Sequence, residues 1–321
     1  MARKLITVLP ALTTSQRERM TAAAQGAGFD ARFFGQAEDA RPELADAEII
    51  LSNIADLAKD APALKWFCSS NAGIDPFLGP DAFANPEAVL TNSSGAYGVA
   101  ISEHIVMVTL ELMRRQPEYN VIVARREWKR NLTVRSIWGS RVTLLGTGDI
   151  GCETARRMRA FGIASLTGVN RHGANPGGLF DRIVTIDNLD RILPETDLLV
   201  MSLPGTPETA GLMNAERLSL LPDTAFLVNV GRGSALDQRA LEQMLRAGRL
   251  AGAALDVFVP EPLPADDPLW DCPGLLITPH VAGNTSLALT VERIVDMFLE
   301  DFDNYCAGRP LKHAVDRKRG Y

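Results

Sequence analysis

Cysteine and histidine are scarce in this chain, and their scarcity excludes several classes of protein. The 321 residues include four cysteines and four histidines. The cysteines lie far apart and form no C-x-x-C pair, so we expect reduced, mostly buried thiols and no disulfide framework. No cluster of histidine, cysteine and carboxylate residues has the spacing of metal ligands, and we predict no metal.

Long hydrophobic runs and an excess of positive charge are also missing. No apolar stretch approaches the length of a transmembrane helix, and residues 1–10 hold too short an apolar run for a secretory signal. The net charge of −6 argues against nucleic acid or an anionic membrane as the main partner. We therefore expect a cytoplasmic protein whose partner is a small molecule.

The composition is that of an ordinary globular protein with room for two cores. Hydrophobic residues make up 46% of the chain and charged residues 22%. Short apolar strands are predicted at 5–9, 30–34, 48–52, 64–69 and 88–91, with a first helix whose N-cap is Thr13, Thr14 or Ser15. Strands that alternate with helical segments predict a parallel sheet with helices on its faces, so the fold class is α/β.

The polar segment at 92–98 is a candidate hinge, and a second α/β unit follows it. We predict a buried helix at 99–115, a break at Pro117 and another helix to about Trp128. The strands of the second unit are expected from Val142 and at 166–169, 198–203, 225–230, 252–257 and 275–278. Its helices are expected at 152–161, 188–193 and 237–250, with a final amphipathic helix at 285–307.

A glycine-rich turn follows the strand that begins at Val142. Gly146, Gly148 and Gly151 have the spacing G-x-G-x-x-G between a plausible strand and a plausible helix. Such glycines permit a tight turn, let the backbone approach a pyrophosphate and let helix and strand pack closely. The turn therefore predicts a dinucleotide site, although glycine-rich turns without a ligand are common. The predicted contacts are Gly146, Thr147, Gly148, Asp149, Ile150 and Gly151.

The end of the next strand indicates which dinucleotide is bound. An acidic residue at this point would accept the ribose hydroxyl of NAD, but the strand ends in Asn170, Arg171 and His172. Arg171 can bind a 2′-phosphate, Asn170 leaves the space uncharged, and His172 can touch the ribose or phosphate. The sequence favours NADP(H), with NAD(H) left open. The alternative is that Arg171 is a solvated turn residue.

Later strand ends supply further candidates for cofactor and substrate contacts. Arg232 lies between two glycines and can hold a carboxylate with its planar guanidinium, although a lone arginine in a turn would be read as a surface residue. His280 and Glu261 follow neighbouring strands, where the carboxylate can orient the imidazole for general acid catalysis. Without Arg232 and Glu261, His280 would be interpreted as structural. The other predicted cofactor contacts are Leu203, Pro204, Thr209, Val230, Gly231, Asp256 and Gly283.

Two further histidines and two tryptophans are not assigned to the predicted site. His104 lies on the buried helix and is predicted to be a structural histidine, while His313 is expected to be exposed. Trp128 and Trp138 are expected to be core or interface aromatics.

The order of these motifs resembles the D-isomer-specific 2-hydroxyacid dehydrogenase family. The resemblance rests on Asn71-Ala72-Gly73, on Glu103-His104, on the glycine turn and on the strand ends at 228–233, 256–261 and 278–280. It implies two doubly wound parallel-sheet domains. A Rossmann nucleotide-binding domain, residues 99–284, would be inserted into a flavodoxin-like substrate domain, residues 1–98 and 285–321.

The resemblance also implies roles for individual residues. Arg232 would bind the substrate carboxylate and 2-oxo group, His280 would be the acid and base, and Glu261 would be its partner. Asn71, Ala72 and Gly73 would contact the substrate, and Asp256 would lie near the nicotinamide. A homodimer built partly on the helices at 99–128 is implied as well.

These inferences combine in one hypothesis with two alternatives. The chain would be an NADP(H)-dependent oxidoreductase that reduces small 2-oxo acids to D-2-hydroxy acids, similar to the glyoxylate/hydroxypyruvate reductases that use NADPH. One alternative is a dinucleotide-sensing scaffold of the corepressor kind. The other is an NAD-linked enzyme of the phosphoglycerate dehydrogenase type, although we do not expect the regulatory domain that many of these carry.

Overall fold

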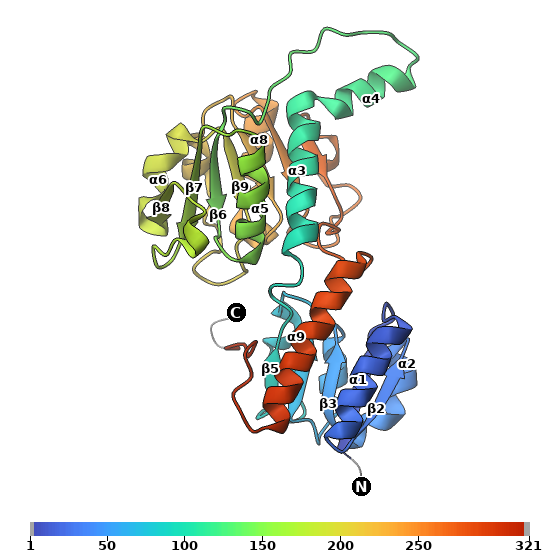
Figure 1. Cartoon of the computed structure of the whole chain (residues 1–321). Coiled ribbons are helices and arrows are strands. Elements are labelled where there is room, and N and C mark those ends of the chain that lie inside the picture. Colours follow the sequence, from blue (N-terminus) through green and yellow to red (C-terminus); the bar gives the residue numbers. More distant parts are fainter. Residues whose placement is uncertain (1–2, 318–321) are drawn as a thin grey trace. The chain divides into compact units, whose positions relative to one another are not determined.

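Two parallel sheets form the framework of the molecule (Figure 1). The computed structural model describes residues 3–317. The chain divides into two compact units, one made of Met1–Tyr97 and Asn284–Tyr321 and the other of Gly98–Gly283. Each unit holds its own sheet, so the prediction of an α/β fold with two parallel-sheet domains is confirmed.

The sheet of the first unit has five strands in the order β2-β1-β3-β4-β5, all of them parallel. This order is the flavodoxin-like one. The strands are β1 (Arg3–Val8), β2 (Phe29–Phe34), β3 (Ala47–Ser52), β4 (Trp66–Ser69) and β5 (Val89–Thr91). The helices are α1 (Thr14–Gly26), α2 (Ala37–Ala40) and α9 (Ala288–Cys306).

The sheet is buried on both faces, which explains why its strands appear as apolar runs in the sequence. All six residues of β3 are buried, as expected for a central strand of a parallel sheet. Helix α1 begins after Thr13, whose hydroxyl accepts the Gln16 amide at 3.3 Å and completes a capping box. The last helix, α9, joins this unit by stacking Phe298 on Trp66, with ring centroids 5.2 Å apart.

The sheet of the second unit has seven parallel strands in the order β12-β11-β10-β9-β6-β7-β8. The chain starts at β6 in the middle, runs out to β8 and then crosses to β9, which is the Rossmann order. The strands are β6 (Arg141–Leu145), β7 (Ser165–Asn170), β8 (Arg182–Thr185), β9 (Leu198–Met201), β10 (Phe226–Asn229), β11 (Gly252–Leu255) and β12 (Leu275–Ile277). The helices are α3 (Gly98–Arg114), α4 (Gln116–Ala124), α5 (Asp149–Ala160), α6 (Leu189–Ile192), α7 (Ala215–Ser219) and α8 (Gln238–Arg246).

Several boundaries differ from those expected. Helix α5 begins at Asp149, three residues before the predicted start, because its first turn uses the fingerprint itself. Helix α4 ends at Ala124, short of Trp128. Strand β8 was not predicted, and as a partly exposed edge strand it lacks the apolar run that marks the central strands.

Some side chains also differ from expectation. Trp128 is 91% exposed and Trp138 is 76% exposed, so neither belongs to the core of the described chain. His313 was expected to be exposed, but its side chain is only 17% accessible and its Nδ1 lies 2.9 Å from the buried Asp301 carboxylate. None of the helices within residues 3–317 has the length and apolar character needed to cross a membrane.

Candidate active site

The glycine turn joins β6 to α5, beside the point where the strand order reverses between β6 and β9. A Cβ on Gly151 would lie 2.2 Å from the Gly146 carbonyl oxygen, and Gly146 has a φ of +103°. At Gly148, by contrast, an added Cβ would meet nothing within 4 Å. Two of the glycines are therefore required by packing and backbone conformation, whereas the middle one leaves open space beside the backbone.

That open space fits a pyrophosphate. Gly148 is the N-cap of α5 and has no side chain with which to cap the helix. The helix N-terminus therefore presents backbone amides and the positive end of its dipole, which is how such turns bind phosphate groups. The Asp149 carboxylate lies against Gly98 at the start of α3. Thr147 and Ile150 are half-buried in the same turn.

Asn170 shapes the loop that follows β7. Its amide nitrogen donates to Thr147 Oγ1 at 2.8 Å and to the Ala174 carbonyl at 2.7 Å, and its Oδ1 accepts the amides of His172 and Gly173. Arg171 and His172 are both exposed at the tip of this loop. Asn170 thus fixes the loop beside the glycine turn and leaves the neighbouring arginine at the surface.

Arg232 lies in a turn after β10 that two glycines allow to pack tightly. A Cβ on Gly231 would be 2.6 Å from the Leu203 carbonyl oxygen, and one on Gly233 would be 2.3 Å from the Phe258 carbonyl carbon. The turn therefore packs tightly against the two segments that follow β9 and β11, at Leu203 and Phe258. The half-buried Arg232 guanidinium donates to the Gly231 carbonyl at 2.8 Å.

His280 and Glu261 meet at the neighbouring strand ends. His280 Nδ1 lies 2.8 Å from Glu261 Oε2, and the other carboxylate oxygen accepts the Phe258 amide at 2.7 Å. A carboxylate can only accept, so Nδ1 carries a proton and Nε2 is the nitrogen left for a substrate. The side chains are 50% and 35% exposed, respectively.

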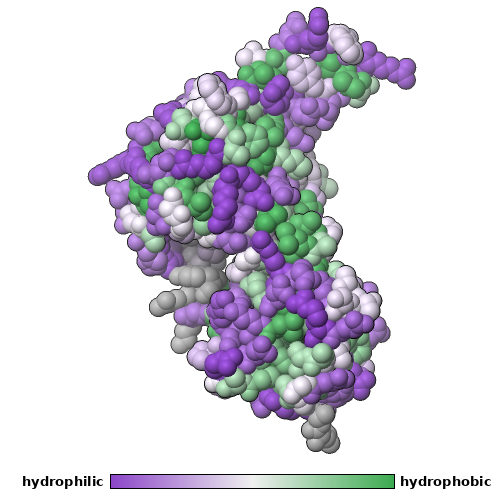
Figure 2. Space-filling view, viewed as in Figure 1, coloured by the Kyte–Doolittle hydropathy of each residue, from purple (hydrophilic) through white to green (hydrophobic). Residues whose placement is uncertain are grey.

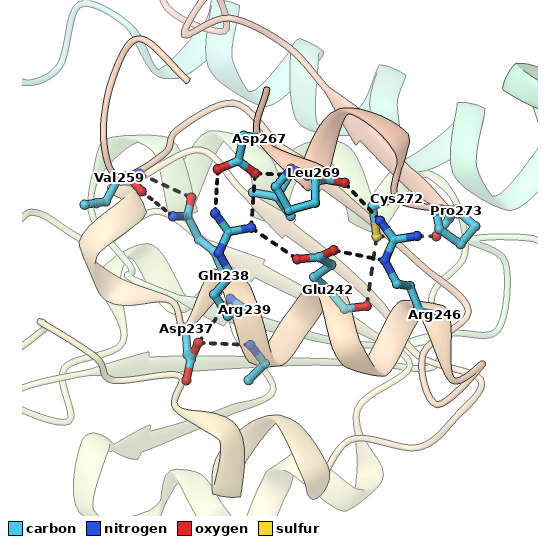
Figure 3. Close-up of polar contacts among 12 residues, drawn as sticks. Asp237, Gln238, Arg239, Glu242, Arg246, Val259, Asp267, Leu269, Cys272 and Pro273 are labelled. Atoms are coloured by element: carbon cyan, nitrogen blue, oxygen red, sulfur yellow. Dashed lines mark hydrogen bonds and ion pairs between the residues drawn. The ribbon is translucent and has the colours of Figure 1, made fainter. Parts of the chain in front are cut away.

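Helix α8 anchors the loop that carries Glu261 (Figure 3). The Gln238 amide exchanges two hydrogen bonds with the Val259 backbone, at 2.8 and 3.2 Å. Further along, Arg239 donates to the buried Asp267 carboxylate at 2.5 and 3.1 Å, and this ion pair lowers the pKa of Asp267. Both ends of the loop are thus attached to one helix, which fixes the Glu261 backbone.

The remaining predicted cofactor contacts lie along the carboxyl edge of the same sheet. Thr209 is 4% exposed, and its hydroxyl donates to the Pro204 carbonyl at 2.7 Å, so it holds its own loop. Asp256 is 2% exposed. Leu203, Val230 and Gly231 are buried, Gly283 is half-buried and Pro204 is exposed.

The predicted substrate loop belongs to the first unit, after β4. Asn92 Nδ2 donates to the Ala72 carbonyl at 2.7 Å, and the Ser93 amide donates to the Asn71 carbonyl at 3.1 Å. Asn71 is exposed, whereas Ala72 and Gly73 are half-buried. This loop lies at the carboxyl edge of its own sheet, where ligands bind in open α/β folds.

Sequence reasoning gave no role to three residues that support this site, namely Asn229, Gln238 and Thr278, although the first and last lie in the motifs at 228–233 and 278–280. Asn229 is fully buried; its Oδ1 accepts the Gly231 amide and its Nδ2 donates to the Arg232 carbonyl, both at 3.1 Å. An asparagine two residues before a tight turn is a recognisable signal for such a contact. No comparable sequence signal marks Gln238 or Thr278.

Comparisons with known proteins identify the family of the chain. Residues 106–282 match the family model described as D-isomer specific 2-hydroxyacid dehydrogenase, NAD binding domain. Glyoxylate/hydroxypyruvate reductase B of Pectobacterium carotovorum subsp. carotovorum (strain PC1) is 33% identical over 255 residues, which cover 76% of this chain and 78% of that protein.

Two solved structures extend the similarity to the whole fold. A D-isomer specific 2-hydroxyacid dehydrogenase family protein from Aeromonas salmonicida subsp. salmonicida A449 aligns with a TM-score of 0.87 and 33% identity, covering 99% of this chain and 100% of that one. An NADPH-dependent glyoxylate/hydroxypyruvate reductase from Sinorhizobium meliloti, in complex with NADP and sulfate, aligns with a TM-score of 0.80 and 28% identity, covering 99% and 100%. The chain therefore belongs to the D-isomer specific 2-hydroxyacid dehydrogenase family and is an NAD(P)-dependent oxidoreductase.

Proposed function

We propose that this protein is an NADPH-dependent reductase of small 2-oxo acids that forms D-2-hydroxy acids. The observation that carries the proposal is the contact of 2.8 Å between His280 Nδ1 and Glu261, on the sheet edge that also bears the Arg232 turn and the glycine turn. An anion-binding group, an oriented acid and a phosphate-binding turn are the parts that this reaction requires. The similarity to glyoxylate/hydroxypyruvate reductases supports this choice of substrate class.

The residues of the chain have distinct roles in this mechanism. The Arg232 guanidinium binds the substrate carboxylate through two parallel N–H···O contacts and so fixes the carbonyl. Bound NADPH supplies the hydride that the carbonyl carbon accepts. His280 donates the proton on Nε2 to the carbonyl oxygen as negative charge develops there. Glu261 accepts from Nδ1 and keeps the ring oriented, so that Nε2 faces the substrate.

The preference for NADPH is assigned to Arg171. Its exposed guanidinium follows the strand end where a carboxylate would bind the ribose hydroxyl of NAD. An arginine at this point attracts a 2′-phosphate, whereas a carboxylate would repel it. Asn170 contributes by holding the loop, and His172 lies beside it. NAD(H) remains the second cofactor that the site accepts.

The two units are given different roles. Residues 99–284 are assigned to the nucleotide, and residues 1–98 with 285–321 to the substrate. Asn71, Ala72 and Gly73 would offer backbone groups to the substrate carboxylate. The protein would act in the cytoplasm.

A homodimer is also part of the proposal. None of the residues of α4 is buried in the described chain, and Val123 and Trp128 are 69% and 91% exposed. Apolar side chains reach the surface over this region (Figure 2). A second copy of the chain would cover them. Light scattering should give twice the chain mass, and Trp128→Glu should shift it toward the monomer.

The two alternative functions are less well supported. A dinucleotide-sensing scaffold has no need of an Arg232 turn or of a histidine oriented by a carboxylate. An NAD-linked enzyme of the phosphoglycerate dehydrogenase type has no evident use for Arg171 at the ribose end of the site.

An initial-rate screen tests the proposal directly. Glyoxylate, hydroxypyruvate, pyruvate and bulkier 2-oxo acids are each offered with NADPH and with NADH. We expect turnover of at least one small 2-oxo acid, with a higher kcat/KM for NADPH than for NADH. Binding of NADPH with no turnover of any 2-oxo acid would favour the scaffold instead.

A further inference from the structure

A line of hydrogen bonds connects α3 to the loop that carries His280. His104, on α3, places its Nε2 3.3 Å from the hydroxyl of Thr278, the residue that follows β12. The same hydroxyl donates to Asp256 Oδ1 at 2.6 Å. Neither His104 nor Thr278 has a role in the mechanism above, yet both are partly buried, and Thr278 lies two residues before His280.

The chemistry of the three groups sets the direction of these bonds. Asp256 is 2% exposed and its carboxylate can only accept, so the single hydroxyl proton of Thr278 points toward it. His104 Nε2 must then be the donor to the Thr278 oxygen. Burial lowers the pKa of His104, partly offset by the nearby charges of Asp256 and Glu111. His104 is therefore a neutral imidazole whose proton lies on Nε2.

Asp256 in turn fixes the backbone of the His280 loop. The His280 amide donates to the Asp256 carbonyl at 2.9 Å. The amides of Val281 and Ala282 donate to the two oxygens of its carboxylate, at 2.9 and 3.0 Å. Three successive amides thus end on one aspartate. The first two of these amides lie on either side of the His280 Cα, and His280 has a φ of +54°, a conformation that residues other than glycine seldom adopt.

The Thr278 hydroxyl keeps this aspartate in place. Without that hydroxyl, Asp256 Oδ1 would lose its shortest contact and could turn away from the amides that hold the left-handed residue. The imidazole would then leave its position on Glu261, although neither residue itself had changed. Charged hydrogen bonds of this length are among the stronger ones in proteins, so loss of the bond from Thr278 to Asp256 should displace the His280 loop.

We propose that Thr278 is a positioning residue for His280, acting through Asp256 and itself oriented by His104. The inference rests on the proposed function, because His280 is the acid only if the protein reduces 2-oxo acids. Thr278 touches neither reacting group in this account. Its main effect is on the placement of the acid, and therefore on kcat more than on dinucleotide binding.

The test compares Thr278→Val, which removes the hydroxyl at nearly constant volume, with Thr278→Ser, which restores it. We expect Thr278→Val to lower kcat by roughly 10- to 100-fold, the effect of a misplacement of about 1 Å. The dissociation constant of NADPH should change far less than kcat, because the glycine turn and the Asn170 loop, to which the phosphates are assigned, lie on other strands. Thr278→Ser should recover most of the lost rate.

Thr143→Val is the matched control in the same unit. Thr143 pairs its buried hydroxyl with Thr196 at 2.8 Å, away from the His280 loop, so it reports the cost of losing a buried hydroxyl alone. This variant should lose stability and keep kcat. A Thr278→Val enzyme with the wild-type kcat, or equal losses in Thr278→Val and Thr278→Ser, would overturn the proposal.

A second pair of variants covers the case in which Thr278→Val does not fold. His104→Gln keeps an N–H donor near the position of Nε2, whereas His104→Phe has none. We expect His104→Gln to retain a higher kcat than His104→Phe, and equal values would contradict the inference. A wild-type enzyme that reduces no 2-oxo acid would instead refute the proposed function, so the two failures are distinguishable.

Discussion

Gly233→Ala tests how tightly the Arg232 turn packs against the loop that carries Glu261. The added Cβ would lie 2.3 Å from the carbonyl carbon and 2.4 Å from the carbonyl oxygen of Phe258, where an ordinary contact begins at 3.4 Å. The two backbones must therefore separate by about 1 Å, because neither is a flexible side chain that could turn aside. The Phe258 amide donates to the Glu261 carboxylate, so a shift of the Phe258 backbone would also move Glu261, the partner of His280.

Gly233→Ala should lower both the free energy of unfolding and kcat/KM. Overpacking of this kind lowers the free energy of unfolding by about 1–3 kcal/mol. A displacement of about 1 Å at an active site lowers kcat/KM by on the order of 100-fold. Urea unfolding gives the first quantity, and initial rates of NADPH oxidation with the best 2-oxo acid give the second.

Gly35→Ala is the control for this prediction. An added Cβ at Gly35 meets nothing within 4 Å, so this variant should keep both its stability and its kcat/KM. If Gly233→Ala has the kcat/KM of the wild type, the turn and the loop are not packed as described.

Three further predictions address the cofactor, the acid limit of stability and the Glu261 loop. Arg171→Ala should raise the KM for NADPH far more than that for NADH, and equal increases would refute its contact with a 2′-phosphate. The hydrogen bond from Arg3 lowers the pKa of Glu48 from its usual 4.5 to about 2. Glu48 therefore contributes stability above pH 4.5 that is lost as the pH falls from 4.5 toward 2, and urea midpoints of Glu48→Gln should lack that part of the decline. Gln238→Leu should lower kcat more than it raises the KM for NADPH, because it frees the loop that bears Glu261; a change in KM alone would contradict this.

The strands at the centres of both sheets could be predicted from the sequence because their burial leaves apolar runs. β3 and β9 are entirely buried and stand out as such runs. β8 does not, because an edge strand needs less apolar surface, and its first residue is the exposed Arg182. The start of α5 was missed for a different reason, since residues 149–151 belong both to the fingerprint and to the first helical turn.

The strand-end residues of the site could also be predicted, because parallel strands bring their carboxyl ends to one edge. Glu261 and His280 follow neighbouring strands, and their contact is of the kind that this rule predicts. Contacts between a helix side chain and the side chain of a distant strand end follow no such rule. His104 and Thr278 are separated by 174 positions, and only the packing of α3 against the sheet brings them together.

Transfer of one hydrogen atom from the cofactor to the substrate tests the proposed reaction itself. NADPH deuterated at the transferring face of nicotinamide C4 is incubated with the protein and hydroxypyruvate, and the product is analysed by mass spectrometry and chiral chromatography. We expect D-glycerate with one deuterium at C2, and loss of this product in His280→Ala with a fall in kcat of roughly 100- to 10,000-fold. A product without deuterium at C2, the L-isomer, or a near-normal rate in His280→Ala would contradict it.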